Sequence, residues 1–147
     1  MRRLVDTGLL FLRVGIGGTL LGVHGWARLM KAFGYLFQGQ QWTFIALVQH
    51  MGFPMPAAFA MASALAESVG ALLLIAGLGT RWAALVVGIN LAVAVGLELS
   101  KHSAAIELPA VYLIAVTAIG IAGAGNYSLD ARLSSPSRMK ADYAAKR

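Results

Sequence analysis

The sequence predicts an all-α membrane protein, a bundle of four transmembrane helices. Four apolar runs fill most of the 147 residues, at Leu4–Trp26, Ala57–Leu78, Trp82–Leu99 and Leu108–Ala124. Each run holds about 17–23 residues, which is enough to cross a hydrocarbon core of about 30 Å. The composition agrees, because 59% of the residues are hydrophobic, 12% are charged and the mean hydropathy is +0.73. Soluble domains carry about 25% charged residues.

The first run follows two arginines, as a signal peptide would, but it is too long for the apolar region of one. It continues into the letters HGWAR at residues 24–28 instead of a small-residue cleavage site. We therefore expect a retained first span. Its Gly18 and Gly22 form a GxxxG motif, which lets helices approach closely in lipid. The motif is compatible both with packing inside the bundle and with a homo-oligomer.

The first loop is expected to carry a short amphipathic helix at about Gln41–Met51, lying in the outer interface or capping the bundle. Apolar residues recur there at positions 44, 47, 48 and 51, the spacing of one helical face. A loop with incidental periodicity is the alternative. Between the second and third spans, the letters AGLGTR at residues 76–81 predict a tight hairpin. Gly77 and Gly79 can end one helix there, and Thr80 can cap the next.

Basic residues predict the orientation and the partners. Four spans place both termini on one side, and eight basic residues lie there against three on the other side, Arg28, Lys31 and Lys101. This bias favours cytoplasmic termini. The eight are Arg2, Arg3, Arg81, Arg132, Arg138, Lys140, Lys146 and Arg147. A net charge of +6 concentrated at the chain ends is typical of contact with anionic lipid and not of nucleic-acid binding. With no cysteine, disulfides and thiolate metal sites are excluded.

Charged residues inside apolar spans are costly in lipid, so they indicate an inward-facing site. Arg13 lies nine residues above the cytoplasmic end of the first span, Glu67 eleven above the end of the second, and Asn90 nine above Arg81. These offsets predict one polar layer, in which Arg13 and Glu67 form a buried ion pair. The pair would either only join two helices or serve a proton relay or ligand.

A second polar layer is predicted near the outer ends of the spans. His24 follows Arg13 by eleven residues and therefore shares its helical face, and Arg28 follows four later. Glu98 and His102 are also four apart. Three interpretations remain open: ordinary polar residues at helix ends, a metal site, or a pocket for a quinone ring. The quinone site would comprise His24, Trp26, Arg28, Glu98 and His102, with Phe53 nearby and His24 as the main donor. The weaker metal alternative comprises His24, Glu98, His102 and Glu107.

Several short motifs together resemble the DoxX family of small bacterial membrane proteins. They are Arg13-x-Gly15, the letters HGWAR with Leu29 after them, Glu67-x-x-Gly70, the letters LIAGLGTR at residues 74–81, Asn90, and GAGNYSLD at residues 123–130. Arg28 stands where the family often has lysine, which keeps the charge. The resemblance implies a four-helix membrane domain, here residues 1–130, followed by a basic cytoplasmic tail, residues 131–147. It also implies the bacterial cytoplasmic (inner) membrane.

The resemblance implies function less directly. The family is similar to the small membrane subunit of thiosulfate:quinone oxidoreductase, and other members associate with redox enzymes. We therefore expect a membrane subunit of a quinone-linked redox system, acting with a redox-enzyme partner. No haem, flavin or nucleotide motif is visible that would let the chain hold its own electron donor. The alternatives are a structural or assembly subunit and a small transporter.

Overall fold

The computed structural model describes residues 2–134, and this part of the chain is helical with no strand. Its elements are α1 (Arg2–Thr19), η1 (Leu20–Gly25), α2 (Trp26–Gln38), α3 (Thr43–His50), α4 (Pro56–Leu65), η2 (Ala66–Gly70), α5 (Ala71–Ala76), α6 (Thr80–Ser100), η3 (Ala104–Ile106), α7 (Glu107–Ala122) and α8 (Leu129–Leu133). The segments η1 and η2 are π-helical turns inside longer helices, and η3 is a 3₁₀ turn.

Within residues 2–134, four helices are long and apolar enough to cross a membrane, which confirms the predicted fold class. They span Arg3–Gln38, Pro56–Ala76, Thr80–Ser100 and Ala104–Ala122. The first differs from the predicted run, because it holds 36 residues and is about 54 Å long at 1.5 Å per residue. It therefore exceeds a hydrocarbon core of about 30 Å, and α2 extends the rod beyond Trp26.

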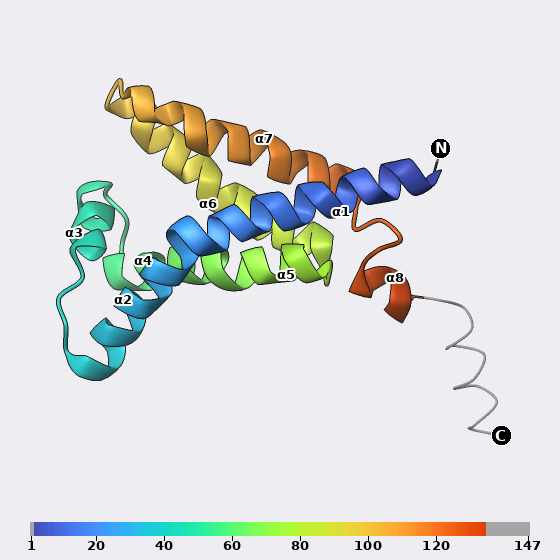
Figure 1. The fold of residues 1–147 in the computed structure, drawn as a ribbon. Helices are drawn as coiled ribbons and strands as arrows, with labels where there is room; N and C mark the ends of the chain where they lie inside the picture. The colour runs from blue at the N-terminus through green and yellow to red at the C-terminus, as the bar shows by residue number, and fades with distance from the viewer. Residues whose placement is uncertain (1, 135–147) are drawn as a thin grey trace.

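The four spans form an antiparallel bundle in which α1 packs on α5 and α7, while α6 packs on α7 and on the second span (Figure 1). Helix α3 packs against α4, beside α2, and confirms the short helix predicted in the first loop. The described chain begins and ends at the same end of the bundle, where the α5–α6 turn also lies (Figure 1). The predicted tail lies outside the described residues except for its first four, 131–134, three of which belong to α8.

Small residues let the helices approach closely. The central core joins Leu20 of η1 to Ala71 and Leu74 of α5, and to further apolar residues of α6 and α7. A second cluster lies under α3, where Trp42 and Val48 pack on α2 and α4. Of the glycines in the first helix, Gly17 and Gly25 make the close approaches to the second span. A methyl group on Gly25 would overlap the backbone oxygen of Glu67.

The GxxxG glycines lie on a different face. Methyl groups on Gly18 and Gly22 would meet no atom within 4 Å, so this motif takes no part in packing within the described bundle. The predicted alternative that these two glycines pack the first helix inside its own bundle is therefore wrong. The close contact comes instead from Gly25, which fits against η2 where both helices contain a π-helical turn.

Candidate functional site

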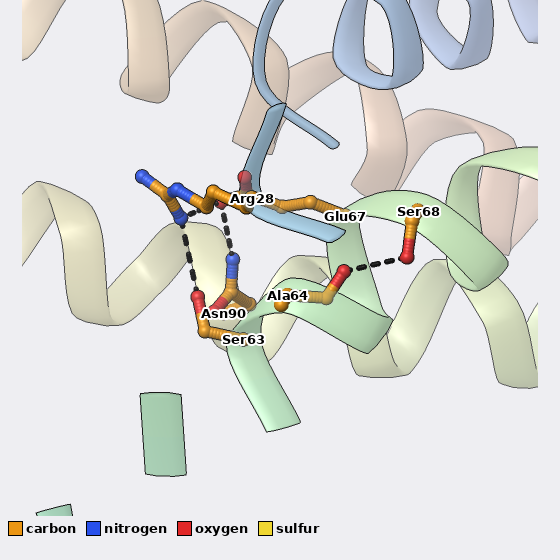
Figure 2. A network of polar contacts seen from close by, with 6 residues as sticks. All are labelled: Arg28, Ser63, Ala64, Glu67, Ser68 and Asn90. Atoms are coloured by element: carbon orange, nitrogen blue, oxygen red, sulfur yellow. Dashed lines mark hydrogen bonds and ion pairs between the residues drawn. The ribbon is translucent and has the colours of Figure 1, made fainter. Parts of the chain in front are cut away.

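The main polar site lies where η1 and α2 cross η2 and α6. We call Arg28, Ser63, Glu67 and Asn90 the polar cluster (Figure 2). Arg28 Nη1 lies 2.6 Å from Glu67 Oε1 and donates also to Ser63 Oγ at 3.2 Å. Asn90 Nδ2 donates to the same Glu67 oxygen at 2.9 Å. One carboxylate oxygen thus joins side chains from α2 and α6 to the second span.

Glu67 is buried, and only one of its two oxygens is satisfied. The Glu67 side chain is 7% exposed and that of Arg28 is 29% exposed, so the pair is largely shielded from the surroundings. Within residues 2–134, Glu67 Oε2 and His24 Nδ1 are buried and have no hydrogen-bond partner. Buried polar atoms without partners are rare in proteins and costly, so they mark a place that a ligand or water can satisfy.

Local helix geometry places Glu67 in this position. It lies in η2, a π-helical turn that begins one residue before it at Ala66. Such turns insert an extra residue into a helix and often occur at functional sites. Ser63 lies one turn earlier on α4, so its hydroxyl and the Glu67 carboxylate point to the same side. Ser68 does not join them, because its Oγ donates to the backbone oxygen of Ala64 at 2.6 Å (Figure 2).

An apolar cavity of about 330 Å³ adjoins the polar cluster. We call it the aromatic cavity, because α3, the following loop and α4 contribute Phe44, Phe53 and Phe59, while α6 closes the other side. Its lining also includes Val48, Met51, Ala62, Ser63, Ala66, Val86, Ile89, Asn90 and Val93. Ser63 and Asn90 are its polar lining residues, and both bond to the Arg28–Glu67 pair. An apolar pocket with a few convergent polar groups is typical of small-molecule sites.

Phe44 lines both this cavity and a more polar pocket between α2 and α3. The second pocket holds about 380 Å³ and includes Arg28, Lys31 and Trp42 in its lining. The guanidinium carbon of Arg28 lies 4.5 Å from the centre of the Phe44 ring. This cation–π contact holds the aromatic ring against the polar cluster.

Of the residues predicted for the central polar layer, Glu67 and Asn90 form a hydrogen bond, but the predicted ion pair of Arg13 with Glu67 is wrong. Glu67 pairs with Arg28 instead. The reason is the helical register. The N-terminal end of α1 extends past the α5–α6 turn, so Arg13 lies level with Leu74 and Gly77, roughly three turns from Glu67.

The predicted outer layer is not assembled as one site. Arg28 belongs to the polar cluster, whereas Trp26 is exposed on α2. Glu98 pairs with Lys101 at 3.4 Å, and His102 is exposed beyond the end of α6. The alternative metal set, which adds the exposed Glu107, is not brought together either. In the part of the chain that the structure describes, no three His, Asp or Glu residues are placed to share a metal ion.

Sequence reasoning did not assign the residues that shape the aromatic cavity, Phe44, Phe59 and Ser63. Phe53 was placed near the site as an apolar wall and does line the cavity. The signal for Ser63 was its position four residues before Glu67, which predicts one shared helical face. The aromatic residues carried no such signal, because they come from three segments whose packing depends on the whole bundle.

Arg13 belongs to a second polar site at the other end of the bundle. Its Nη2 donates to the backbone oxygen of Tyr127 at 2.7 Å, and its Nη1 donates to that of Leu74 at 3.4 Å. Asp130 accepts the backbone N–H of Gly79 at 2.7 Å and of Thr80 at 3.0 Å. The start of α6 is therefore capped by Asp130 and not, as predicted, by Thr80.

The pKa of Asp130 reflects the contacts of this second site. Partial burial acts to raise the pKa of Asp130, but the hydrogen bonds from Thr80 and Gly79 and the nearby charge of Arg13 outweigh it. The pKa of Asp130 is therefore held below its usual value. Asp6 of α1 adds a further connection, because its carboxylate accepts hydrogen bonds from the backbone N–H and from the side-chain amide of Asn126. The residues GAGNYSLD thus fasten the end of the fourth span to α1 and to the α5–α6 turn.

A comparison with known protein families shows which family the chain belongs to. The sequence matches the DoxX family over residues 8–103, more than half of the chain. The chain belongs to the DoxX family. Proteins of this family are membrane proteins, often associated with oxidoreductase and quinone systems. No curated protein and no solved structure matches the chain.

Proposed function

We propose that this DoxX protein is the membrane subunit of a quinone-linked redox system and contributes a quinone site to a partner redox enzyme. The observation that carries the proposal is the aromatic cavity next to the polar cluster. Its volume of about 330 Å³ falls at the lower end of ligand pockets, which span about 300–1,000 Å³. Aromatic walls suit a flat ring, and the polar lining residues lie together at one side.

The polar cluster provides hydrogen-bond donors for such a ring. Ser63 Oγ accepts from Arg28, which leaves its own O–H to donate. Asn90 uses one N–H for Glu67, and its second amide hydrogen is available. A quinone carbonyl oxygen in the cavity would accept one of these hydrogens. The charged Arg28–Glu67 pair behind them orients both donors. Electrons would come from the partner enzyme, and the chain itself would bind and orient the ring.

The first test is quinone binding by the purified protein. The double variant Ser63→Ala/Asn90→Leu should weaken binding of a ubiquinone analogue at least about tenfold, the effect of about 1.4 kcal/mol of lost hydrogen bonding. Thr117→Ala is the matched control. Thr117 lines a different groove, between α6 and α7, and not the aromatic cavity, so this substitution should leave binding unchanged. Binding would be followed by isothermal titration or by ultraviolet analysis of extracted lipid.

A specific observation favours the alternative of a structural subunit. The polar cluster joins α2, the second span and α6, which is what a purely stabilising network would do. If the wild-type protein retains no quinone and binds no analogue, the structural role leads and the redox proposal fails. His24→Ala tests the donor that the sequence suggested, His24, against Ser63 and Asn90. It should leave quinone binding unchanged, because His24 does not line the aromatic cavity.

We further propose that the protein lies in the bacterial cytoplasmic membrane with both termini in the cytoplasm, as the positive-inside bias indicates. Because the chain has no cysteine, single cysteines report its topology cleanly. In intact cells, Gln38→Cys at the end of α2 should react with an impermeant thiol reagent, and Ser134→Cys after α8 should not. Labelling of Ser134→Cys alone would reverse the orientation.

A further inference from the structure

A long apolar groove adjoins the aromatic cavity on its cytoplasmic side. The groove holds about 640 Å³ and runs between the second span and α6. It extends from Ala62 to Leu73 along the second span, a distance of about 16 Å, and its far end lies at Gly79 and Asp130. We call it the lipid-facing groove, because large apolar side chains such as Val69 and Trp82 line it and are exposed.

The groove and the cavity share walls. Ala62, Ala66 and Val86 line both, so the end of the groove meets the aromatic cavity close to Ser63. A larger groove of about 660 Å³ lies between α6 and α7, but it shares only Ile89 with the cavity. The lipid-facing groove is therefore the one that continues the site.

The distribution of polarity is one-sided. Ser63 and Asn90, with the Arg28–Glu67 pair behind them, lie at the end of the groove that meets the aromatic cavity. From there to Leu78 the lining is apolar, and its exposed residues belong to two helices that are apolar enough to span a membrane. An aromatic cavity with two polar groups, followed by an apolar groove facing lipid, matches an amphiphile with a compact ring at its head and a long hydrocarbon tail.

We propose that the lipid-facing groove seats the tail of a long-chain prenylated quinone whose ring occupies the aromatic cavity. This inference rests on the proposed function for the ring, and it adds that the ligand enters sideways from the bilayer. Because lipid and groove are similarly apolar, the tail gains little from leaving lipid. Its contribution is orientation, since a tail held along the groove directs the ring toward Ser63 and Asn90.

The experiment uses two probes with the full-length protein in lipid nanodiscs. One is a short-chain ubiquinone analogue, and the other is a prenylated quinone with a photoreactive diazirine in its tail. Photolabelling by the long-chain probe should map to the groove residues of the second span and α6. Val69→Trp, which fills the groove and does not line the aromatic cavity, should reduce that labelling at least about fivefold and leave short-chain binding unchanged.

Ile121→Trp is the matched control, because Ile121 is an exposed residue that lines only the α6–α7 groove. It should change neither probe. The tail site is overturned if the labels map to the α6–α7 groove, or if both variants lose the labelling equally. Binding of the short-chain analogue would still support the ring site in that case. Failure of both probes to bind the wild-type protein overturns the proposed function itself. If a saturated phospholipid displaces the label from the groove as effectively as a quinone does, the groove binds ordinary lipid and the tail site is overturned.

Discussion

Glu67→Ala is expected to be among the most destabilising single substitutions in the polar cluster, costing about 3 kcal/mol. The carboxylate accepts from Arg28 and from Asn90, and its removal leaves a cationic side chain without its partner in a largely buried position. Breaking a buried pair typically costs about 3–5 kcal/mol. We expect the lower end of that range because the Arg28 side chain is 29% exposed and also lines the more polar pocket beside Phe44.

The chain supplies a matched control in its other described ion pair. Glu98 and Lys101 lie three residues apart with side chains 22% and 45% exposed, so Glu98→Ala should cost less than about 0.5 kcal/mol. Removing Arg28 together with Glu67 should recover part of the loss, because no charge is then left unpaired. Thermal or denaturant unfolding in detergent measures all three variants. If Glu67→Ala and Glu98→Ala lowered the free energy of unfolding equally, the polar cluster would not stabilise the fold more than an exposed ion pair does.

The fold could be predicted because lipid imposes strong constraints on sequence. An apolar run of about 20 residues has few alternatives to a spanning helix, and the stripe around Phe44 and Leu47 predicted α3. The hydrogen bond between Glu67 and Asn90 was also predictable, since the second span ends and α6 begins at the same short turn, from which depth can be counted. The α5–α6 turn fixes that register over only a few residues.

The pairing of Arg13 failed because the first helix has no such reference point. Depth was counted from Leu4 as though the apolar run began at the membrane surface, but the rod spans 36 residues and its start lies beyond the turn at Gly77. The position of the first helix along the second span is set by close packing, in particular of Gly25 on the backbone of Glu67. Such contacts depend on the shapes of two helices together, and neither helix specifies them alone. The same holds for the aromatic cavity.

The C-terminal motif GAGNYSLD was recognised as a family feature, and the structure supplies its physical role. Asp130 caps α6, Tyr127 accepts from Arg13, and Ser128 Oγ donates to the backbone oxygen of Gly125 at 2.6 Å. Family resemblance therefore marked the residues without indicating what they contact. The contact from Arg13 to Tyr127 crosses more than 100 residues of sequence, and no periodicity within a helix reveals it.

Gly77→Ala should abolish this second site and cost more than about 3 kcal/mol. Gly77 has φ +67°, a left-handed conformation that costs other residues about 1–2 kcal/mol. Its new methyl group would also overlap the Arg13 guanidinium and lie 2.6 Å from Ser128 Cβ. Arg13 is fully buried and bonded to Tyr127, so it cannot move aside without breaking that contact.

Gly79→Ala separates the two contributions, because Gly79 also has a left-handed φ, +56°, but its methyl group would meet no atom within 4 Å. It should cost only the conformational penalty of about 1–2 kcal/mol. The difference between the two variants in unfolding free energy therefore measures the steric conflict with Arg13. Adding Arg13→Ala to Gly77→Ala should be less than additive, since the clash is then gone. Equal losses for Gly77→Ala and Gly79→Ala would mean that Arg13 does not pack against the turn, and that the C-terminal segment is held by Asp130 and Asp6 alone.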